Sequence, residues 1–160
     1  MEITVKGKNE KLAKAEAKFA TNYYLNMLLK KSIVENLIVA IKFSKLSEKG
    51  LCSPEDDDDN DLPREFIIEI DNRMSKPEQL RTLAHECVHL KSFSTGELKY
   101  SKHANCMLWK RKKVYLDKID YWDLPSEIEA FGREVGLYVR YLDHKKEMNL
   151  KFLSPSEKRK

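Results

Sequence analysis

Cysteine is scarce in this 160-residue chain, and long apolar runs are missing from it. The three cysteines, Cys52, Cys87 and Cys106, are odd in number and lack the spacing of a metal or redox motif, which is typical of a reducing compartment. No apolar run is long enough to cross a membrane, and the charged start Met1 to Lys6 does not have the pattern of a signal peptide. We therefore expect a cytoplasmic protein that does not enter a membrane.

A strong excess of one charge is also missing. The formal net charge is +4, and acidic and basic residues are interleaved along the chain. The acidic run over residues 55–61 lacks the glycine and the terminal glutamate of an EF-hand loop, so we interpret it as a solvated surface loop and not as a calcium site. The basic run Lys110 to Lys113 and the basic residues after 144 make nucleic acid a weaker candidate partner, because a basic patch marks only an electrostatic footprint.

The most informative feature is the pentapeptide HECVH, residues 85–89. Two histidines four residues apart lie on one face of an α-helix, where both imidazoles can reach one metal ion. Glu86 leans toward the same side and is suited to act as general base on a metal-bound water. The motif predicts a zinc hydrolase in which His85 and His89 bind the metal and Glu86 is catalytic.

The residues around the motif favour a helix. Lys76-Pro77-Glu78 has the pattern of a helix start, and no proline or glycine follows before Phe93. At helical spacing, an apolar group lies opposite the histidines: Leu80, Leu83, Cys87 and Leu90. We therefore expect the Cys87 thiol to point into the core and to take no part in the site.

A catalytic zinc needs a third protein ligand and leaves its fourth position to water. A second helix is expected to begin at Pro125 and Ser126, with an inward apolar stripe formed by Ile128, Phe131, Val135, Tyr138 and Leu142. Glu129 lies beside this stripe, on a face shared with Gly132 and Gly136. Because two glycines four residues apart weaken a helix, they suggest that another helix approaches closely there.

We therefore expect Glu129 to be the third zinc ligand. Glu127 is the alternative on the same helix, but it projects nearly opposite to Glu129 and has the character of a first-turn acid favoured by the helix dipole. An oxyanion donor is also expected from among Tyr121, Arg133 and Tyr138, and the residues alone do not choose between them.

Taken together, four segments resemble small zincin-like metallopeptidases encoded by bacteriophages, distantly related to the SprT-like and ImmA/IrrE groups. The segments are HECVH, Gly96-Glu97-Leu98, the stretch YWDLP at 121–125 and EIEAFGRE at 127–134, and the likeness covers about residues 65–141. The resemblance implies that His85, His89 and Glu129 bind zinc, that Glu86 is the catalytic acid and base, and that a phage-encoded chain would work in the host cytoplasm.

The chain departs from this resemblance in two places. Ser126 stands where a tryptophan would follow the proline in PWEIEA-type relatives, which affects the wall of the site more than its chemistry. SprT-like proteins take a third histidine after HExxH, and His103 is placed for that role. The glycine that usually follows such a histidine is absent, so His103 ranks below Glu129 as the third ligand.

The expected fold class is α+β, with residues 1–144 forming a single zincin-like domain of the gluzincin type and residues 145–160 forming a basic tail. We expect a small, mostly antiparallel sheet beside the HExxH helix. The expected elements are a strand at 3–5, a helix within 8–31, strands at 33–43 and 65–70 separated by a loop at 44–64, and a hairpin at 106–109 and 114–116.

The expected function is zinc-dependent hydrolysis of peptide bonds in a peptide or protein substrate that the sequence does not identify. Two alternatives stay open. One is a binding or assembly protein with a structural zinc site, although a structural site has no need of the Glu86 base. The other is a SprT-like protease that acts on DNA-associated proteins.

Overall fold

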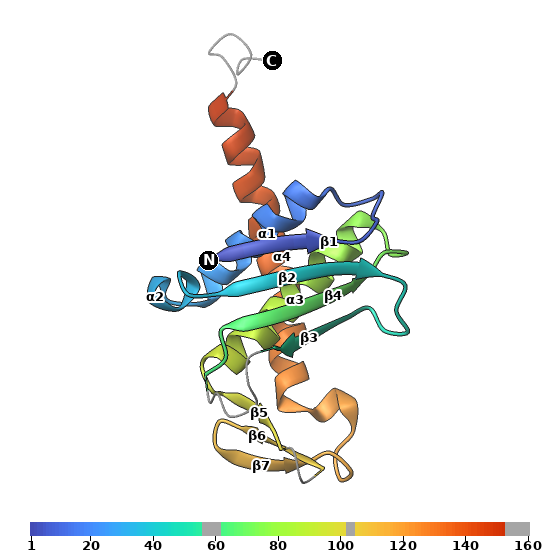
Figure 1. Ribbon diagram of the computed structural model, residues 1–160, viewed down its shortest axis with the longest axis vertical. Helices are drawn as coiled ribbons and strands as arrows, with labels where there is room; N and C mark the ends of the chain where they lie inside the picture. The colour runs from blue at the N-terminus through green and yellow to red at the C-terminus, as the bar shows by residue number, and fades with distance from the viewer. Residues whose placement is uncertain (56–61, 102–104, 153–160) are drawn as a thin grey trace.

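The computed structural model describes residues 1–55, 62–101 and 105–152. It has an α+β fold, as expected, with a four-stranded sheet, a three-stranded sheet and a group of helices (Figure 1). Residues 56–61 of the expected acidic loop lie outside the described residues, and so does His103. Within the described part of the chain, no helix is long and apolar enough to cross a membrane.

The larger sheet has the strand order β1, β2, β4, β3, with bounds Glu2–Lys6, Ile38–Ser44, Glu65–Asp71 and Gly50–Pro54. Strand β2 pairs in parallel with both β1 and β4, and only β3 is antiparallel, to β4. The expected mostly antiparallel sheet is therefore wrong for this larger sheet. The intervening helices after β1 give the chain the length it needs to return and start β2 in the same direction.

Strands β2 and β4 each present one apolar face. Val39, Ile41 and Phe43 of β2 are buried, and the residues between them are partly exposed. This period-two pattern is typical of a sheet covered on one side and common in antiparallel sheets, so it gives no sign of the parallel pairing of these strands. Strand β3 was missed altogether, because Gly50, Ser53 and Pro54 are residues that usually mark turns.

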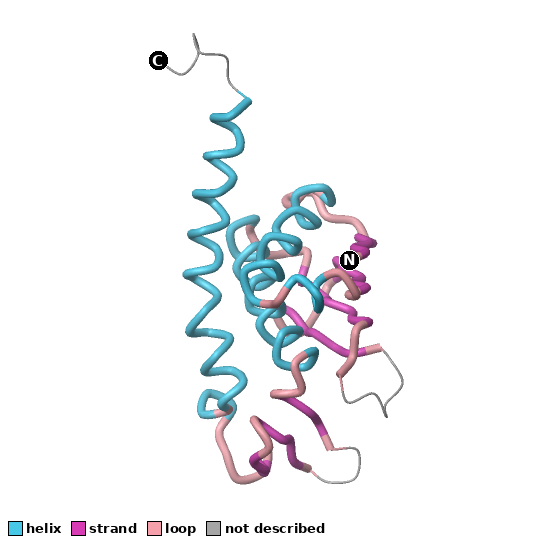
Figure 2. Tube along the Cα trace, turned by 90° about the vertical axis from the view of Figure 1, so that its left-hand side faces the viewer, coloured by secondary structure: helices cyan, strands magenta, loops and turns pink. Residues whose placement is uncertain are grey.

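Helices cover the buried face of the larger sheet in two layers. Helix α1 (Lys14–Leu28) and helix α3 (Lys76–Ser94) lie next to the strands, and helix α4 (Pro125–Phe152) lies on the far side of them (Figure 2). A short helix α2 (Lys31–Val34) links α1 to β2. The molecule is therefore built in three layers: sheet, two helices and one long outer helix.

Helix α3 begins as the sequence predicts. The backbone N–H of Ser75 donates to the Glu78 carboxylate at 3.0 Å, and Pro77 stands in the first turn. Caps of this kind contribute about 1 kcal/mol to helix stability. The helix ends before Gly96, whose φ of 72° lies in the left-handed region that a side chain disfavours. Cys87 is fully buried, as expected.

The smaller sheet consists of β5 (Leu98–Tyr100), β6 (Cys106–Trp109) and β7 (Lys112–Tyr115), all antiparallel. The expected hairpin is confirmed, although its second strand begins at Lys112 and not at Val114 as expected. A short 3-10 helix η1 (Tyr121–Asp123) then leads into α4. Helix α4 continues to Phe152, so the described part of the expected basic tail is helical.

Helix α4 buries a different face from the one expected. The residues that it buries are Ser126, Glu127, Ala130, Leu137 and Tyr141. Of the expected inward stripe, Ile128, Phe131 and Val135 are exposed instead. The helix is thus rotated relative to the sequence prediction, and this rotation decides which acid reaches the histidines.

Candidate metal centre

Two successive turns of α3 bring the histidines of the motif together. The Nε2 atoms of His85 and His89 lie 3.1 Å apart, because residues four positions apart stand on one helix face. His85 is buried and His89 is partly buried. The rings thus converge on one point below the surface, as the spacing of the motif predicts.

The first turn of α4 supplies the acid that completes the group. Glu127 places Oε2 at 3.3 Å from His85 Nε2 and Oε1 at 3.2 Å from His89 Nε2. Its side chain is nearly as buried as those of the histidines. The three donor atoms all lie within 4.8 Å of one another, so His85, His89 and Glu127 can hold a metal ion.

Glu129, the expected third ligand, points elsewhere, and the sequence assignment is corrected to Glu127. The Glu129 carboxylate accepts a 2.9 Å hydrogen bond from the Lys91 ammonium group and forms ion pairs with Lys110 and Arg133. Burial raises the pKa of Glu129, but the hydrogen bond and charge of Lys91 outweigh it and lower the pKa. The rotation of α4 explains these different surroundings. With Ala130 facing the core, Glu127 faces the histidines of α3, and Glu129 faces Lys91 and Lys110.

Two imidazole nitrogens and a carboxylate oxygen are donors that divalent metal ions take in proteins. The Nε2 atoms of His85 and His89 lie 3.1 Å apart, and Glu127 reaches the two rings through different oxygens, Oε2 at 3.3 Å and Oε1 at 3.2 Å. Within the described part of the chain these three residues are the group that could hold an ion, and a four-coordinate ion held by three protein ligands would take its fourth ligand from solvent.

Helix α4 also provides a carboxylate behind His85. Glu134 Oε2 lies 3.0 Å from His85 Nδ1, and because a carboxylate only accepts, the ring must donate its Nδ1–H. A ring that donates from Nδ1 can offer its Nε2 lone pair to a metal once Nε2 has given up the proton that it shares with Glu127. The ring of Phe131 packs edge-on against His85, with centroids 4.6 Å apart. The His85 ring is therefore held from two sides by one helix.

Tyr121 orients the Glu127 carboxylate. The phenol of Tyr121, in η1, donates to Glu127 Oε2 at 2.7 Å. Burial raises the pKa of Glu127, but hydrogen bonds with His85 and His89 outweigh it and leave the pKa well below its usual range. Glu127 is therefore held as a carboxylate, the form in which it binds a metal.

Glu86 sits behind the histidines against strand β3. It is buried, and burial raises the pKa of its carboxyl group to about 7, with the charges of His89 and His85 opposing the shift. A Cβ atom built on Gly50 would lie 2.8 Å from Glu86 Oε1 and 2.7 Å from the Thr82 methyl group. Only glycine at this position lets the β3 backbone pass so close to the Glu86 side chain.

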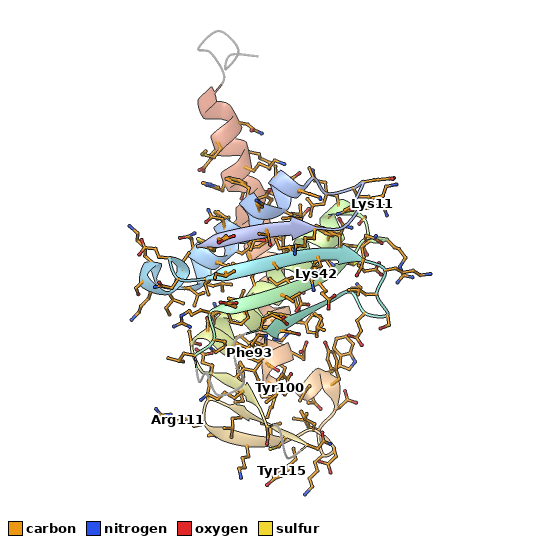
Figure 3. All side chains as sticks on the ribbon, viewed as in Figure 1. Lys11, Lys42, Phe93, Tyr100, Arg111 and Tyr115 are labelled. Atoms are coloured by element: carbon orange, nitrogen blue, oxygen red, sulfur yellow. The ribbon has the colours of Figure 1, made fainter. Side chains whose placement is uncertain are left out.

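A cavity of about 350 Å³ joins these groups. Its wall includes His85, Glu86, His89 and Glu127 together with the full length of β3. Phe93 and Tyr100 line it as well, and Figure 3 shows them between the larger sheet and the β5–β6–β7 sheet. The cavity is therefore bounded by α3, the edge of the larger sheet and the smaller sheet.

Of the three expected oxyanion donors, Tyr121 is the one that lines this cavity. Arg133 pairs with Glu129, and Tyr138 packs against the hydrophobic core. Tyr100 lines the cavity too and was not anticipated. Glu127 and Glu134 could have been recognised together, because residues seven apart share one helix face. Gly50 and Tyr100 carry no such sequence signal.

The chain matches no protein-family model, no curated protein and no solved structure. The interpretation of the site therefore depends on its own geometry and chemistry.

Proposed function

We propose that this protein is a zinc-dependent peptide hydrolase. The observation that carries the proposal is the position of Glu86, a buried carboxyl group in the wall of the same cavity as the three metal-binding side chains. His85, His89 and Glu127 would hold the ion. A site that only stabilised the fold would need these ligands but not a further acid at the cavity.

A zinc ion bound there would polarise the scissile carbonyl and lower the pKa of a water molecule. Glu86 is the residue suited to accept a proton from that water and to pass it to the leaving amine, since it faces the cavity. Glu134 keeps the His85 ring in the metal-binding tautomer, and Tyr121 keeps Glu127 in place. Each residue thus has one chemical role.

The edge of the larger sheet supports a peptide as the substrate. Strand β3 is the last strand of that sheet, pairs with β4 and lines the cavity from Gly50 to Pro54. An extended peptide can add to such an edge by main-chain hydrogen bonds, which bind any sequence. Tyr100 lines the same cavity, and its phenol is suited to donate to the carbonyl oxygen during attack, whereas the Tyr121 phenol already donates to Glu127.

The decisive experiment compares Glu86→Gln with the wild-type chain. Glutamine keeps the size of the side chain but accepts no proton, so the variant should retain one zinc per chain and lose at least 100-fold of its hydrolytic rate. Zinc is measured by elemental analysis, and hydrolysis by mass spectrometry on a degenerate peptide library. The exposed Glu147→Gln serves as the control acid and should match the wild type.

Two results would contradict the proposal. One is wild-type protein that carries zinc but cleaves no member of the library. The other is a Glu86→Gln variant that cleaves peptides as fast as the wild type.

A further inference from the structure

The cavity continues along α3 beyond the metal-binding group. Phe93 follows His89 by four residues, so it stands on the same face of the helix, about 5.4 Å further along the axis. Its ring lines the cavity together with Leu98 and Tyr100 of β5, and the rings of Phe93 and Tyr100 pack with centroids 5.9 Å apart (Figure 3). We call Phe93, Leu98 and Tyr100 the apolar end of the cavity.

Strand β3 runs along the cavity in the same direction as α3. Gly50, its first residue, lies against the side chain of Glu86. Its last residue, Pro54, pairs with the start of β4, where the Arg64 guanidinium group donates to the Ser94 carbonyl at the end of α3 at 2.8 Å. Eight residues of helix and four of strand both advance about 12–13 Å. A peptide bound along β3 therefore passes the metal-binding group and the apolar end in succession.

The spacing along α3 decides which residue of such a peptide meets the apolar end. An extended chain advances about 3.3 Å per residue, so the turn of helix between His89 and Phe93 corresponds to less than two residues of peptide. The apolar end therefore receives the side chain of a residue that directly flanks the bond under attack. A residue several positions away would lie outside it.

The wall of the apolar end favours a large apolar side chain. Phe93 and Leu98 are exposed by only 6 and 1%, so they form a fixed floor, whereas Tyr100 is 55% exposed and leaves the side of the cavity open. Filling this end would remove water from two aromatic rings and one aliphatic side chain. The whole cavity, of about 350 Å³, lies near the lower limit of ligand pockets, so it has room for a short peptide segment.

The charges around the cavity disfavour an acidic side chain. Glu48, Glu86 and Glu127 line it, and its wall contains no lysine or arginine among the described residues. A carboxylate that entered the apolar end would lose water and find no cationic side chain there to replace it. The cavity is therefore unsuited to aspartate or glutamate beside the scissile bond.

We propose that the apolar end selects peptides with a large apolar residue next to the scissile bond and rejects those with an acidic residue there, and that Phe93 sets the size of the side chain accepted. The inference rests on the proposed function, because it takes a peptide as the bound molecule. Peptide binding can be measured without hydrolysis, so the two proposals can fail separately.

Isothermal titration of the full-length Glu86→Gln variant tests the selection. The probes are alanine pentapeptides whose central residue is phenylalanine, alanine or glutamate. The phenylalanine peptide should bind at least about tenfold more tightly than the alanine peptide, and the glutamate peptide should bind most weakly. Phe93→Trp in the same protein fills the apolar end and should reduce the preference for phenylalanine over alanine toward one. Phe19→Trp is the matched control, because Phe19 lies on α1 outside the cavity wall, and it should keep the full preference.

Phe93→Leu gives the opposite readout. The smaller side chain enlarges the apolar end, so the affinity for a tryptophan-centred peptide should rise relative to the phenylalanine peptide. Each comparison is a ratio within one protein, so a partly unfolded variant does not change it. Equal binding of the three probes, no binding of the phenylalanine peptide up to about 1 mM, or unchanged ratios in both Phe93 variants would overturn the proposal.

Cleavage assays on the wild type separate this proposal from the proposed hydrolysis. Selective binding without cleavage would support the apolar end as a peptide site and contradict the hydrolase. Cleavage with no preference for an apolar residue beside the scissile bond would support the hydrolase and overturn the selection.

Discussion

Two glutamates on one helix turn have opposite environments in this structure. Glu127 faces two histidines, and Glu129 faces Lys91 and Lys110. We expect Glu127→Gln to weaken zinc binding by at least tenfold, because the amide lacks the negative charge that Glu127 brings to the ion. Glu129→Gln is the matched control and should bind zinc like the wild type. A competition titration with a chromophoric chelator measures both affinities, and the reverse order would reinstate Glu129 as the ligand.

Glu134 would act on a bound metal through His85, whose Nδ1 lies 3.0 Å from the Glu134 carboxylate. Removal of the carboxylate that orients a metal-binding histidine typically costs 10- to 100-fold in metal affinity. We expect Glu134→Ala to show a loss of that size and Glu134→Gln a smaller one, because the glutamine carbonyl still accepts from the His85 Nδ1–H. Isothermal titration with zinc distinguishes the two variants. Equal affinity in wild type and Glu134→Ala would leave Glu134 without this role.

Sequence reasoning identified the first part of the site and mistook the second. His85, Glu86 and His89 follow from their spacing within a single helix, where local geometry fixes which face they share. The third group comes from α4, whose rotation depends on tertiary packing. The prediction placed the largest apolar residues inside, yet Ala130 and Ser126 are buried while Ile128 is exposed. Small residues allow α4 to approach α3, and this packing brings Glu127 to the histidines.

At the scale of elements, strand β3 and helix α3 meet at one glycine. Gly50→Ala would place a methyl group 2.8 Å from Glu86 Oε1 and 2.7 Å from the Thr82 side chain, so strand and helix must separate or Glu86 must move. We expect a destabilisation of about 1–3 kcal/mol with zinc retained, since the metal-binding residues do not contact this position. Urea unfolding measures the loss of stability, and elemental analysis measures the zinc content. A variant with wild-type stability would mean that the edge strand adapts freely.

Comparison of predicted and observed strands gives a similar result: local features were predicted, and features set by tertiary packing were not. Strand β4 and the hairpin of β6 and β7 were anticipated, although β7 begins earlier than expected, because each contains a short apolar segment bounded by polar residues. The parallel order of the larger sheet was not, because it depends on how the segments between strands cross over. The turn of the hairpin shows that sequence also gives limited guidance on local structure. Lys110 and Arg111 both adopt positive φ there, where asparagine and glycine are the usual residues.

At the scale of the whole molecule, one carboxylate joins the three main helices. Glu16 of α1 pairs with Lys76 of α3 at 2.5 Å and with Lys145 of α4, and the Tyr141 hydroxyl also donates to it. Burial raises the pKa of Glu16, but its hydrogen bonds with the two lysines outweigh it and lower the pKa. The stabilisation is therefore present above the unfolded pKa of about 4.3 and is lost as pH falls through the lower folded value.

We accordingly expect Glu16→Gln to lower the melting temperature at pH 7, with the difference from the wild type shrinking toward zero as pH falls below 4. The measurement is a series of thermal melts by circular dichroism between pH 2 and 7. Glu10→Gln is a suitable control, because Glu10 pairs with Lys8 at a fully solvated position. A difference that persists at the lowest pH would assign the effect to packing and not to charge.

The candidate metal-binding group is divided between α3 and α4, and Glu127 follows His89 by 38 residues. In the unfolded chain these donors are separated by a long flexible segment, so an ion finds the complete set only after α3 and α4 have packed. Ligand binding and folding are then a single coupled equilibrium, and an ion at 1,000 times its dissociation constant adds about 4 kcal/mol to the free energy of unfolding. Metal supply would thereby set how long the chain survives proteolysis in a cell, whatever substrate it acts on.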